Sequence, residues 1–196
     1  MALLGTLFLP LHQGVEDFPG QPKHQSLSSS HEAGHAVIAE YLGYRVIHVS
    51  TAGAIVPADS PEAVLLSNGE LAATGGYVEI DLPRLRPSDP DLDKDLQDIA
   101  TFRMGGRAAE ELTHPESALP NHWKADVGEF KEPLKKYKTE AELNGFLEEG
   151  YRRAKELLRD PEIMMQHQRL RQLLVSGVCS NRPNGEFVRK AIKGGK

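Results

Sequence analysis

Two histidines four residues apart constrain this chain most. His31 and His35 flank Glu32 in the sequence HEAGH, and residues 31–42 continue as helix formers up to Gly43. In an α-helix, residues i and i+4 lie on one face, so both imidazoles can reach a single ion. Glu32 is rotated to the flank of that pair, where its carboxylate can take a proton from a water molecule. We therefore expect a helix with His31 and His35 as metal ligands and Glu32 as general base.

The identity of the ion follows from the rest of the chain. The single cysteine, Cys179, excludes a thiolate cluster and an internal disulfide, so histidine and carboxylate ligands remain. Zinc is the default ion of such sites, and a catalytic zinc keeps an open position beside three protein ligands. The alternative is a chance pattern on a solvated helix. It is disfavoured because apolar residues 36–38 follow at once and would leave the polar side chains semi-buried without a partner charge.

The third ligand remains open on residue chemistry alone. Several carboxylates and histidines lie well downstream of His35, and each is of a type that binds zinc. No spacing rule selects among them. The candidates are Glu110, Glu111, His114, His122, Asp126 and Glu129.

Length and periodicity predict one mainly α domain with a small β-sheet. With 196 residues, 18 of them glycine and 13 proline, the chain suffices for one ordinary domain and is not of low complexity. We expect serine hydroxyls at residues 28–30 to cap the helix of residues 31–42, and Gly43 to end it. Further helices are expected over residues 89–112, near Asp126, over 139–159, from Pro161 and over 186–192, and strands over residues 44–50 and 76–81.

Single residues carry narrower predictions. Gly105 and Gly106 lie inside the expected second helix, where glycine costs about 1 kcal/mol relative to alanine. We expect another backbone to approach closely there, and a break in the helix is the alternative. Trp123 either lines a substrate pocket or anchors a loop by packing. We assign His24 and His167 to the surface.

Charge and the missing motifs exclude several classes of function. The chain has 23 basic and 28 acidic residues and a net charge of −5, which is unlike a nucleic-acid-binding protein. It contains no phosphate-binding loop of the type GxxxxGK[ST], so ATP is not expected as a cofactor. The apolar stretch of residues 1–10 is too short for a membrane span. We expect a soluble, cytoplasmic protein.

Three blocks of sequence point to a known family. In chain order they are HEAGHAVIAEYL at 31–42, GGRAAEEL at 105–112 and YRRAKELL at 151–158. Together they resemble the peptidase domain of FtsH-type AAA+ zinc proteases, over about three quarters of the chain. The resemblance implies a zincin-like HExxH metallopeptidase domain over residues 28–176, ending in a helical hairpin over 139–176. Residues 1–27 are then an N-terminal extension, and residues 177–196 are a polar C-terminal tail.

The same resemblance suggests the third ligand. In that family an aspartate after the second block completes the zinc site, and the matching position is Asp126. The surrounding sequence HWKADV departs from the family pattern, and Pro133 shortens the helix that should follow. His122, one helical turn earlier, is the alternative ligand.

The function implied is that of a zinc metalloendopeptidase. We expect it to hydrolyse unfolded or flexible polypeptides without ATP, because the AAA+ motor and membrane anchor of the family are missing from the chain. An extended substrate would add as a strand at residues 75–80 or 46–50. The expected partners are further copies of this chain, which could form a hexamer, or an AAA+ motor on another chain. The alternatives are a zinc-stabilised, non-catalytic adaptor or regulator of an FtsH-type protease, and a peptidase acting on one regulatory protein.

Overall fold

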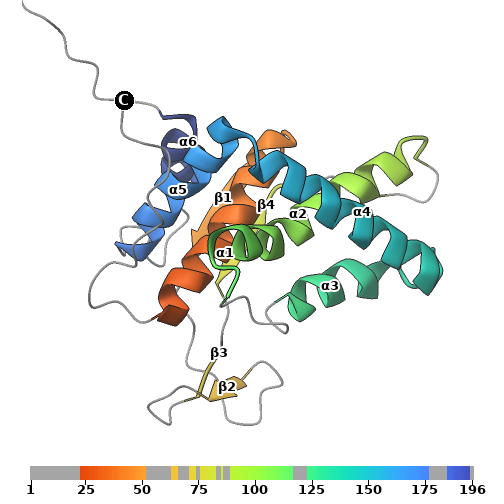
Figure 1. The fold of residues 1–196 in the computed structure, drawn as a ribbon. Helices are drawn as coiled ribbons and strands as arrows, with labels where there is room; N and C mark the ends of the chain where they lie inside the picture. Colours follow the sequence, from red (N-terminus) through yellow and green to blue (C-terminus); the bar gives the residue numbers. More distant parts are fainter. Residues whose placement is uncertain are drawn as a thin grey trace, which may run out of the picture.

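The fold is mainly helical with a small antiparallel sheet, as the sequence predicts. The computed structural model describes residues 23–51, 63–65, 71–73, 76–82, 85, 89–116, 123–176 and 185–194. In chain order the elements are α1 (Lys23–Tyr41), β1 (Val46–Ser50), β2 (Ala63–Leu65), β3 (Leu71–Ala73), β4 (Tyr77–Ile80), α2 (Leu92–Thr113), α3 (Lys124–Lys131), the 3-10 turn η1 (Glu132–Leu134), α4 (Glu140–Leu158), α5 (Pro161–Val175) and α6 (Gly185–Lys193). Figure 1 shows α1 at the centre of these elements.

The crossing of α1 and α2 forms the centre of the core. A Cβ atom added to Gly34 would lie 2.5 Å from the carbonyl oxygen of Gly105, so the two backbones touch. Gly105 therefore serves the close approach that the sequence predicts, and α2 continues through it without a break. Apolar side chains of both helices seal the crossing; those buried are Ala33, Ala36, Val37, Ile38, Leu96, Ala100, Met104, Ala108 and Ala109.

The start of α1 differs from the prediction. We expected the serines of residues 28–30 to cap the helix, but α1 begins at Lys23 and these serines lie inside it. Ser29 and Ser30 are buried, and the Ser30 hydroxyl lies 2.7 Å from that of Thr113. The serines indicate a helix start because they are cap-forming residue types, but the structure places them inside α1, where the Ser30 hydroxyl has a partner on α2. The end of α1 agrees with the prediction, since Gly43 has a φ of 87°.

Helices α4 and α5 follow each other in the segment where the sequence predicts a helical hairpin. Thr139 and Glu142 make the expected capping box at the start of α4. Pro161 is the first residue of α5, and the Asp160 carboxylate accepts hydrogen bonds from the backbone of the first turn. The two helices contact each other less than they contact the core, because α4 packs mainly on α2 and α5 mainly on α1.

The sheet consists of β1 and β4. These strands pair antiparallel from Val46 opposite Ile80 to Ser50 opposite Tyr77, with an irregularity between Val46 and His48. Both lie in segments where the sequence predicts strands. A second pair, β2 with β3, was not expected and forms a separate two-stranded sheet.

Helix α6 packs on the start of β1 and on α5. Val188 and Ile192 of α6 are buried, and Arg189 donates a hydrogen bond of 2.7 Å to the carbonyl oxygen of Val46. This helix matches the one predicted over residues 186–192. Among the described residues, no helix is long and apolar enough to cross a membrane.

Candidate metal centre

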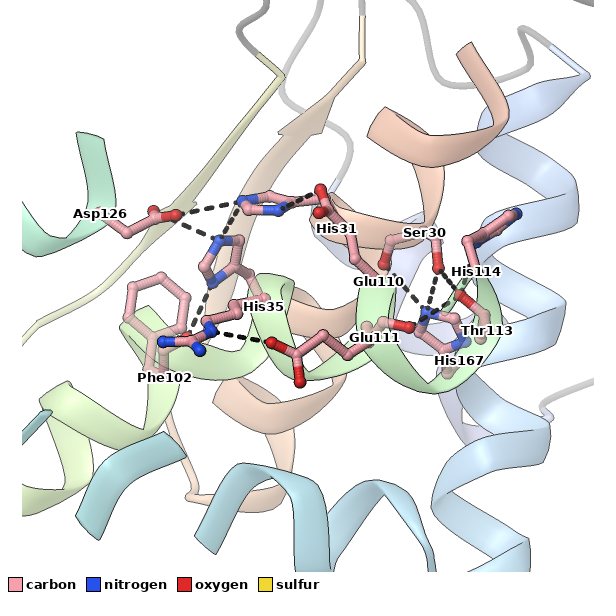
Figure 2. A network of polar contacts seen from close by, with 12 residues as sticks. Ser30, His31, His35, Phe102, Glu110, Glu111, Thr113, His114, Asp126 and His167 are labelled. Carbon is pink, nitrogen blue, oxygen red and sulfur yellow. Dashed lines mark hydrogen bonds and ion pairs between the residues drawn. The ribbon is translucent and has the colours of Figure 1, made fainter. Parts of the chain in front are cut away.

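Three predicted ligands meet at one point of the structure. His31 and His35 come from α1, and Asp126 comes from the first turn of α3 (Figure 2). The two Nε2 atoms of the histidines lie 2.9 Å apart. One oxygen of the Asp126 carboxylate is 3.1 Å from His31 Nε2, and the other is 3.3 Å from His35 Nε2. All three side chains are largely buried, with 8% of His31 and 3% of His35 exposed.

The far side of each imidazole ring is held by a hydrogen bond. His35 Nδ1 donates to the carbonyl oxygen of Phe102 at 2.7 Å, and His31 Nδ1 donates to the buried carboxylate of Glu110 at 2.9 Å. A carbonyl oxygen can only accept, so the proton of a neutral His35 lies on Nδ1. In the neutral rings both Nε2 lone pairs therefore face each other and the Asp126 carboxylate. Ligand histidines of metal sites are commonly oriented by such partners.

This donor set fits a zinc ion. Two nitrogen atoms and one carboxylate oxygen at bond lengths of about 2.1 Å from a tetrahedral ion would lie about 3.4 Å from one another. The two Nε2 atoms lie 2.9 Å apart, Asp126 Oδ2 lies 3.1 Å from His31 Nε2, and Asp126 Oδ1 lies 3.3 Å from His35 Nε2, all slightly shorter than that value. Electron-rich atoms this close repel one another unless a positive charge lies between them. Within the described part of the chain, this trio is the group of histidine and acidic side chains placed to hold a metal ion.

The pKa values show how strongly the site attracts positive charge. Burial alone would lower the pKa of His31, but its hydrogen bonds to the carboxylates of Asp126 and Glu110 raise that pKa well above its usual value. Burial alone would raise the pKa of Asp126, yet its electrostatic interaction with His35 and the hydrogen bonds with both histidines hold that pKa well below its ordinary range. In the absence of metal a proton supplies the positive charge. Metal binding should therefore release protons.

Glu32 lies beside this group and not within it. Its side chain is 5% exposed, and burial raises the pKa of its carboxyl to about 7, although the charges of the histidines partly oppose that rise. A carboxyl with a pKa near neutrality can both accept and return a proton at neutral pH. The predicted general base therefore has a suitable environment for that role.

Glycines make room for two of these side chains. A Cβ atom added to Gly76, directly before β4, would lie 2.4 Å from the Glu32 carboxyl. At Gly106 of α2, an added Cβ atom would lie 2.5 Å from His31 Nε2. Close approach was predicted for Gly106, but the neighbour is an imidazole ring and not a backbone. Neither glycine can be replaced without displacing a side chain of the site.

The other candidates for the third ligand have different partners. Glu110 holds His31 from behind, while Glu111 pairs with Arg107 at 3.0 Å. His114 Nδ1 lies 2.7 Å from the Thr113 hydroxyl, and Glu129 forms an ion pair with Arg103. His122 lies outside the described residues, so the alternative to Asp126 is not placed by the structure. The sequence predicts Glu110 only as a candidate metal ligand. It does not predict that Glu110 orients His31 through a hydrogen bond to Nδ1.

His167 was wrongly predicted to be a surface residue. It is fully buried on α5, and its Nε2 donates to the carbonyl oxygen of Ser30 at 2.9 Å. Burial lowers the pKa of His167 to about 4, so the ring is neutral under ordinary conditions. Figure 2 shows this contact on the far side of Glu110 from the ligand trio. The residue fixes α5 against the helix that carries the site. The side chain of His24 lies outside the described residues.

Comparison with family models and with curated proteins gives no match. The likeness to FtsH-type peptidase domains therefore depends on the three sequence blocks alone. In the structure these blocks lie on α1, on the second half of α2 and on α4.

Proposed function

We propose that this protein is a zinc metalloendopeptidase with a zincin-like catalytic domain. The observation that carries the proposal is the convergence of His31, His35 and Asp126, with both outer Nδ1 atoms of the histidines hydrogen bonded and their Nε2 atoms facing the carboxylate. When bound there, zinc supplies a Lewis acid that activates water and polarises a carbonyl group. The position of Glu32 beside the trio supports a hydrolytic role over a purely structural metal.

The residues divide the work of peptide hydrolysis among them. Glu32 accepts the proton of the attacking water and returns it to the amine that leaves, a task suited to its pKa of about 7. Glu110 and the Phe102 carbonyl keep the histidine rings in the tautomer that binds a cation. The cysteine content gives no reason to place the enzyme in an oxidising compartment, so we place its activity in the cytoplasm.

The edge of β4 is the better of the two proposed substrate edges. Gly76 and β4 lie directly beside Glu32, whereas α6 already covers the start of β1 and uses the Val46 carbonyl oxygen. Among the described residues β4 pairs only with β1, and we propose that the substrate adds as a strand on the other side of β4. A polypeptide bound there is read through its backbone and needs to be extended. Unfolded or flexible chains are therefore the proposed substrates. Gly75, the first residue of the predicted edge, lies outside the described residues.

The test compares the wild-type chain with Glu32→Gln. Both proteins are loaded with Zn²⁺, their metal content is measured, and hydrolysis of an unfolded protein is followed without ATP. We expect cleavage by the wild type and at least a 100-fold loss in the variant at equal zinc content. Equal activity of the two proteins would overturn the role of Glu32. If neither cleaves and the chain is recovered with an AAA+ protease, the adaptor role replaces the peptidase.

A further inference from the structure

Helix α3 carries one ligand of the site but is a short, peripheral element. It has eight residues, packs on α2 and continues into η1. In Figure 1 it lies at the side of the molecule, away from the central crossing. Asp126 is the one member of the ligand trio that does not come from α1. The contacts that fix α3 therefore decide whether the third ligand reaches the two histidines.

The end of α3 is anchored in the core. Phe130 is 2% exposed and belongs to the main hydrophobic cluster. One residue earlier, Glu129 forms an ion pair with Arg103 of α2. Phe130 lies four residues after Asp126 and on the same side of the helix. This anchor alone leaves the first turn, which holds Asp126, free to tilt.

The start of α3 is anchored by a cation between two aromatic rings. The guanidinium of Arg107 lies over the ring of Trp123 at 4.5 Å and over the ring of Tyr151 of α4 at 4.2 Å, both distances measured to the ring centroid. Both are well inside the range of about 6 Å for favourable cation–π contacts. Trp123 is the residue directly before α3, so α2 and α4 together hold the beginning of that helix.

The orientation of Arg107 is itself fixed. Its Nε donates to the Glu111 carboxylate at 3.0 Å. Glu111 also accepts a hydrogen bond from the Tyr151 hydroxyl and one of 3.3 Å from Lys155. A charge held on one side by a carboxylate and on two sides by aromatic rings has little freedom to move. The arrangement of Arg107 over the rings of Trp123 and Tyr151, called the Arg107 stack below, is therefore a rigid support for Trp123.

We propose that Arg107 is a positioning residue for the third metal ligand, acting through Trp123. Trp123 precedes Asp126 by three residues, so their side chains lie on one face. The Trp123 carbonyl oxygen accepts the hydrogen bond of Val127, 3.1 Å long, that closes the first turn of α3. By fixing Trp123, Arg107 also fixes the first turn of α3, which directs the Asp126 carboxylate toward the two histidines. Metal ligands tolerate displacements of only about 0.2 Å, so a small tilt of α3 would remove Asp126 from the site.

Zinc affinity tests this inference, which rests on the metal-binding part of the proposed function. The affinity of the full chain for Zn²⁺ is measured by competition with a chromophoric chelator. We expect Arg107→Met to weaken binding about 10- to 100-fold, the range typical of residues that orient ligands. Arg152→Met is the matched control, because Arg152 lies on α4, is 58% exposed and contacts only Glu149 and Glu156 among the ion pairs of the described residues. The control should bind as the wild type does.

A double-mutant cycle separates positioning from a general loss of stability. If Arg107 acts through Asp126, Arg107→Met weakens zinc binding in the wild type but adds no loss in an Asp126→Ala background. Equal losses in both backgrounds, or no loss in the first, would overturn the proposal. Circular dichroism confirms that each variant is folded. Should Arg107→Met fail to fold, Trp123→Ala takes its place in the cycle, with Trp123→Phe expected to restore affinity because it keeps the ring.

Tryptophan fluorescence gives a second readout. Trp123 is the only tryptophan of the chain, so its emission reports on the start of α3 without a label. We expect Zn²⁺ to change this emission in the wild type and to leave it unchanged in Asp126→Ala. An emission that ignores zinc in both proteins would overturn the link between the stack and the ligand. A chain that shows the zinc response and the cycle but no hydrolysis would refute the peptidase and leave the role of Arg107 standing.

Discussion

The α1–α2 crossing and α3 supply ligands to the same site in opposite ways. His31 and His35 lie on a helix whose backbone touches its neighbour at Gly34 and Gly105, and their rings are locked by Glu110 and Phe102. Their positions come from the core itself. Asp126 instead comes from an eight-residue helix held at its two ends. Two ligands are thus preorganised by folding, and the third depends on the contacts of Phe130 with the core and of Trp123 with Arg107.

This difference teaches where the site can be adjusted. A change near the crossing should alter the stability of the whole fold, because the helix that carries the two histidines also forms the closely packed core. A change on α3 should alter metal affinity and leave the core intact. The predictions that follow probe this contrast, beginning with the largest effect.

Adding one methyl group at the crossing should be the most damaging change. In Gly34→Ala the new Cβ atom would lie 2.5 Å from the Gly105 carbonyl oxygen and 2.6 Å from the Ala109 Cβ atom, so the helices must separate. We expect the free energy of unfolding to fall by about 3 kcal/mol, measured by chemical denaturation. Gly145→Ala is the control, because nothing lies within 4 Å of its added Cβ atom. A loss in the control as large as in Gly34→Ala would refute the steric explanation.

Acid should weaken the packing of α5 on α1 through His167. Its pKa is about 4 in the folded protein and about 6.5 when unfolded, so between these pH values only the unfolded chain takes up the proton. The free energy of unfolding therefore falls as the pH is lowered from 6.5 to 4, by about 3 kcal/mol in total from this group. Denaturation curves in the presence of a chelator should show a smaller pH dependence for His167→Gln. Parallel pH profiles of the two proteins would contradict this assignment.

Removing zinc should loosen α3 before it affects the crossing. At a free Zn²⁺ concentration 100 times the dissociation constant, bound metal stabilises a fold by about 2.7 kcal/mol, and a chelator removes that contribution. Hydrogen exchange should show faster exchange of the α3 amides after chelation, while the α1 and α2 amides around Gly34 and Gly105 stay protected. Uniform acceleration along the chain would show that the two regions do not differ in this way.

The smallest expected effect is a gain. Gly128 lies in α3, with open space around its added Cβ atom and no unusual backbone angle. Gly128→Ala should raise the helix propensity of α3 and stabilise it by about 0.5–1 kcal/mol. Because a more ordered α3 needs less reorganisation, zinc affinity should rise slightly, measured by chelator competition. Weaker zinc binding would indicate that α3 must bend to hold the ion.

The sequence predicted the histidine side of the site more fully than the carboxylate side. The spacing of His31 and His35 implies a helix and a shared face, and periodicity predicts the partner helix that crosses it. Asp126 had no such local rule, since its position depends on how α3 packs. Only the resemblance to a known family selected it among six candidates. The Arg107 stack was also hidden, because its three side chains come from separate parts of the chain.

The failures have physical causes of the same kind. Residues 28–30 look like a helix start because serine favours caps, but they lie inside α1, where α2 and α5 supply partners for the hydroxyl and carbonyl groups of Ser30. His167 lies between two glutamines, which suggest a solvated face, yet its ring donates a hydrogen bond to the Ser30 carbonyl oxygen inside the core. The strands β2 and β3 have three residues each, too few for a period-2 pattern to be recognised.

The hydrogen bonds at the Nδ1 atoms of the two histidines also determine which ions the site should bind poorly. Since Glu110 and the Phe102 carbonyl occupy both Nδ1 atoms, the rings offer nitrogen lone pairs inward, and Asp126 adds one carboxylate. Calcium binds six to eight oxygen atoms, and magnesium prefers an octahedron of oxygen ligands, so both abundant cellular cations are poor matches. Cobalt, nickel and copper accept the same nitrogen-rich donors. The site should therefore bind calcium and magnesium poorly and be selective for zinc and similar transition-metal ions.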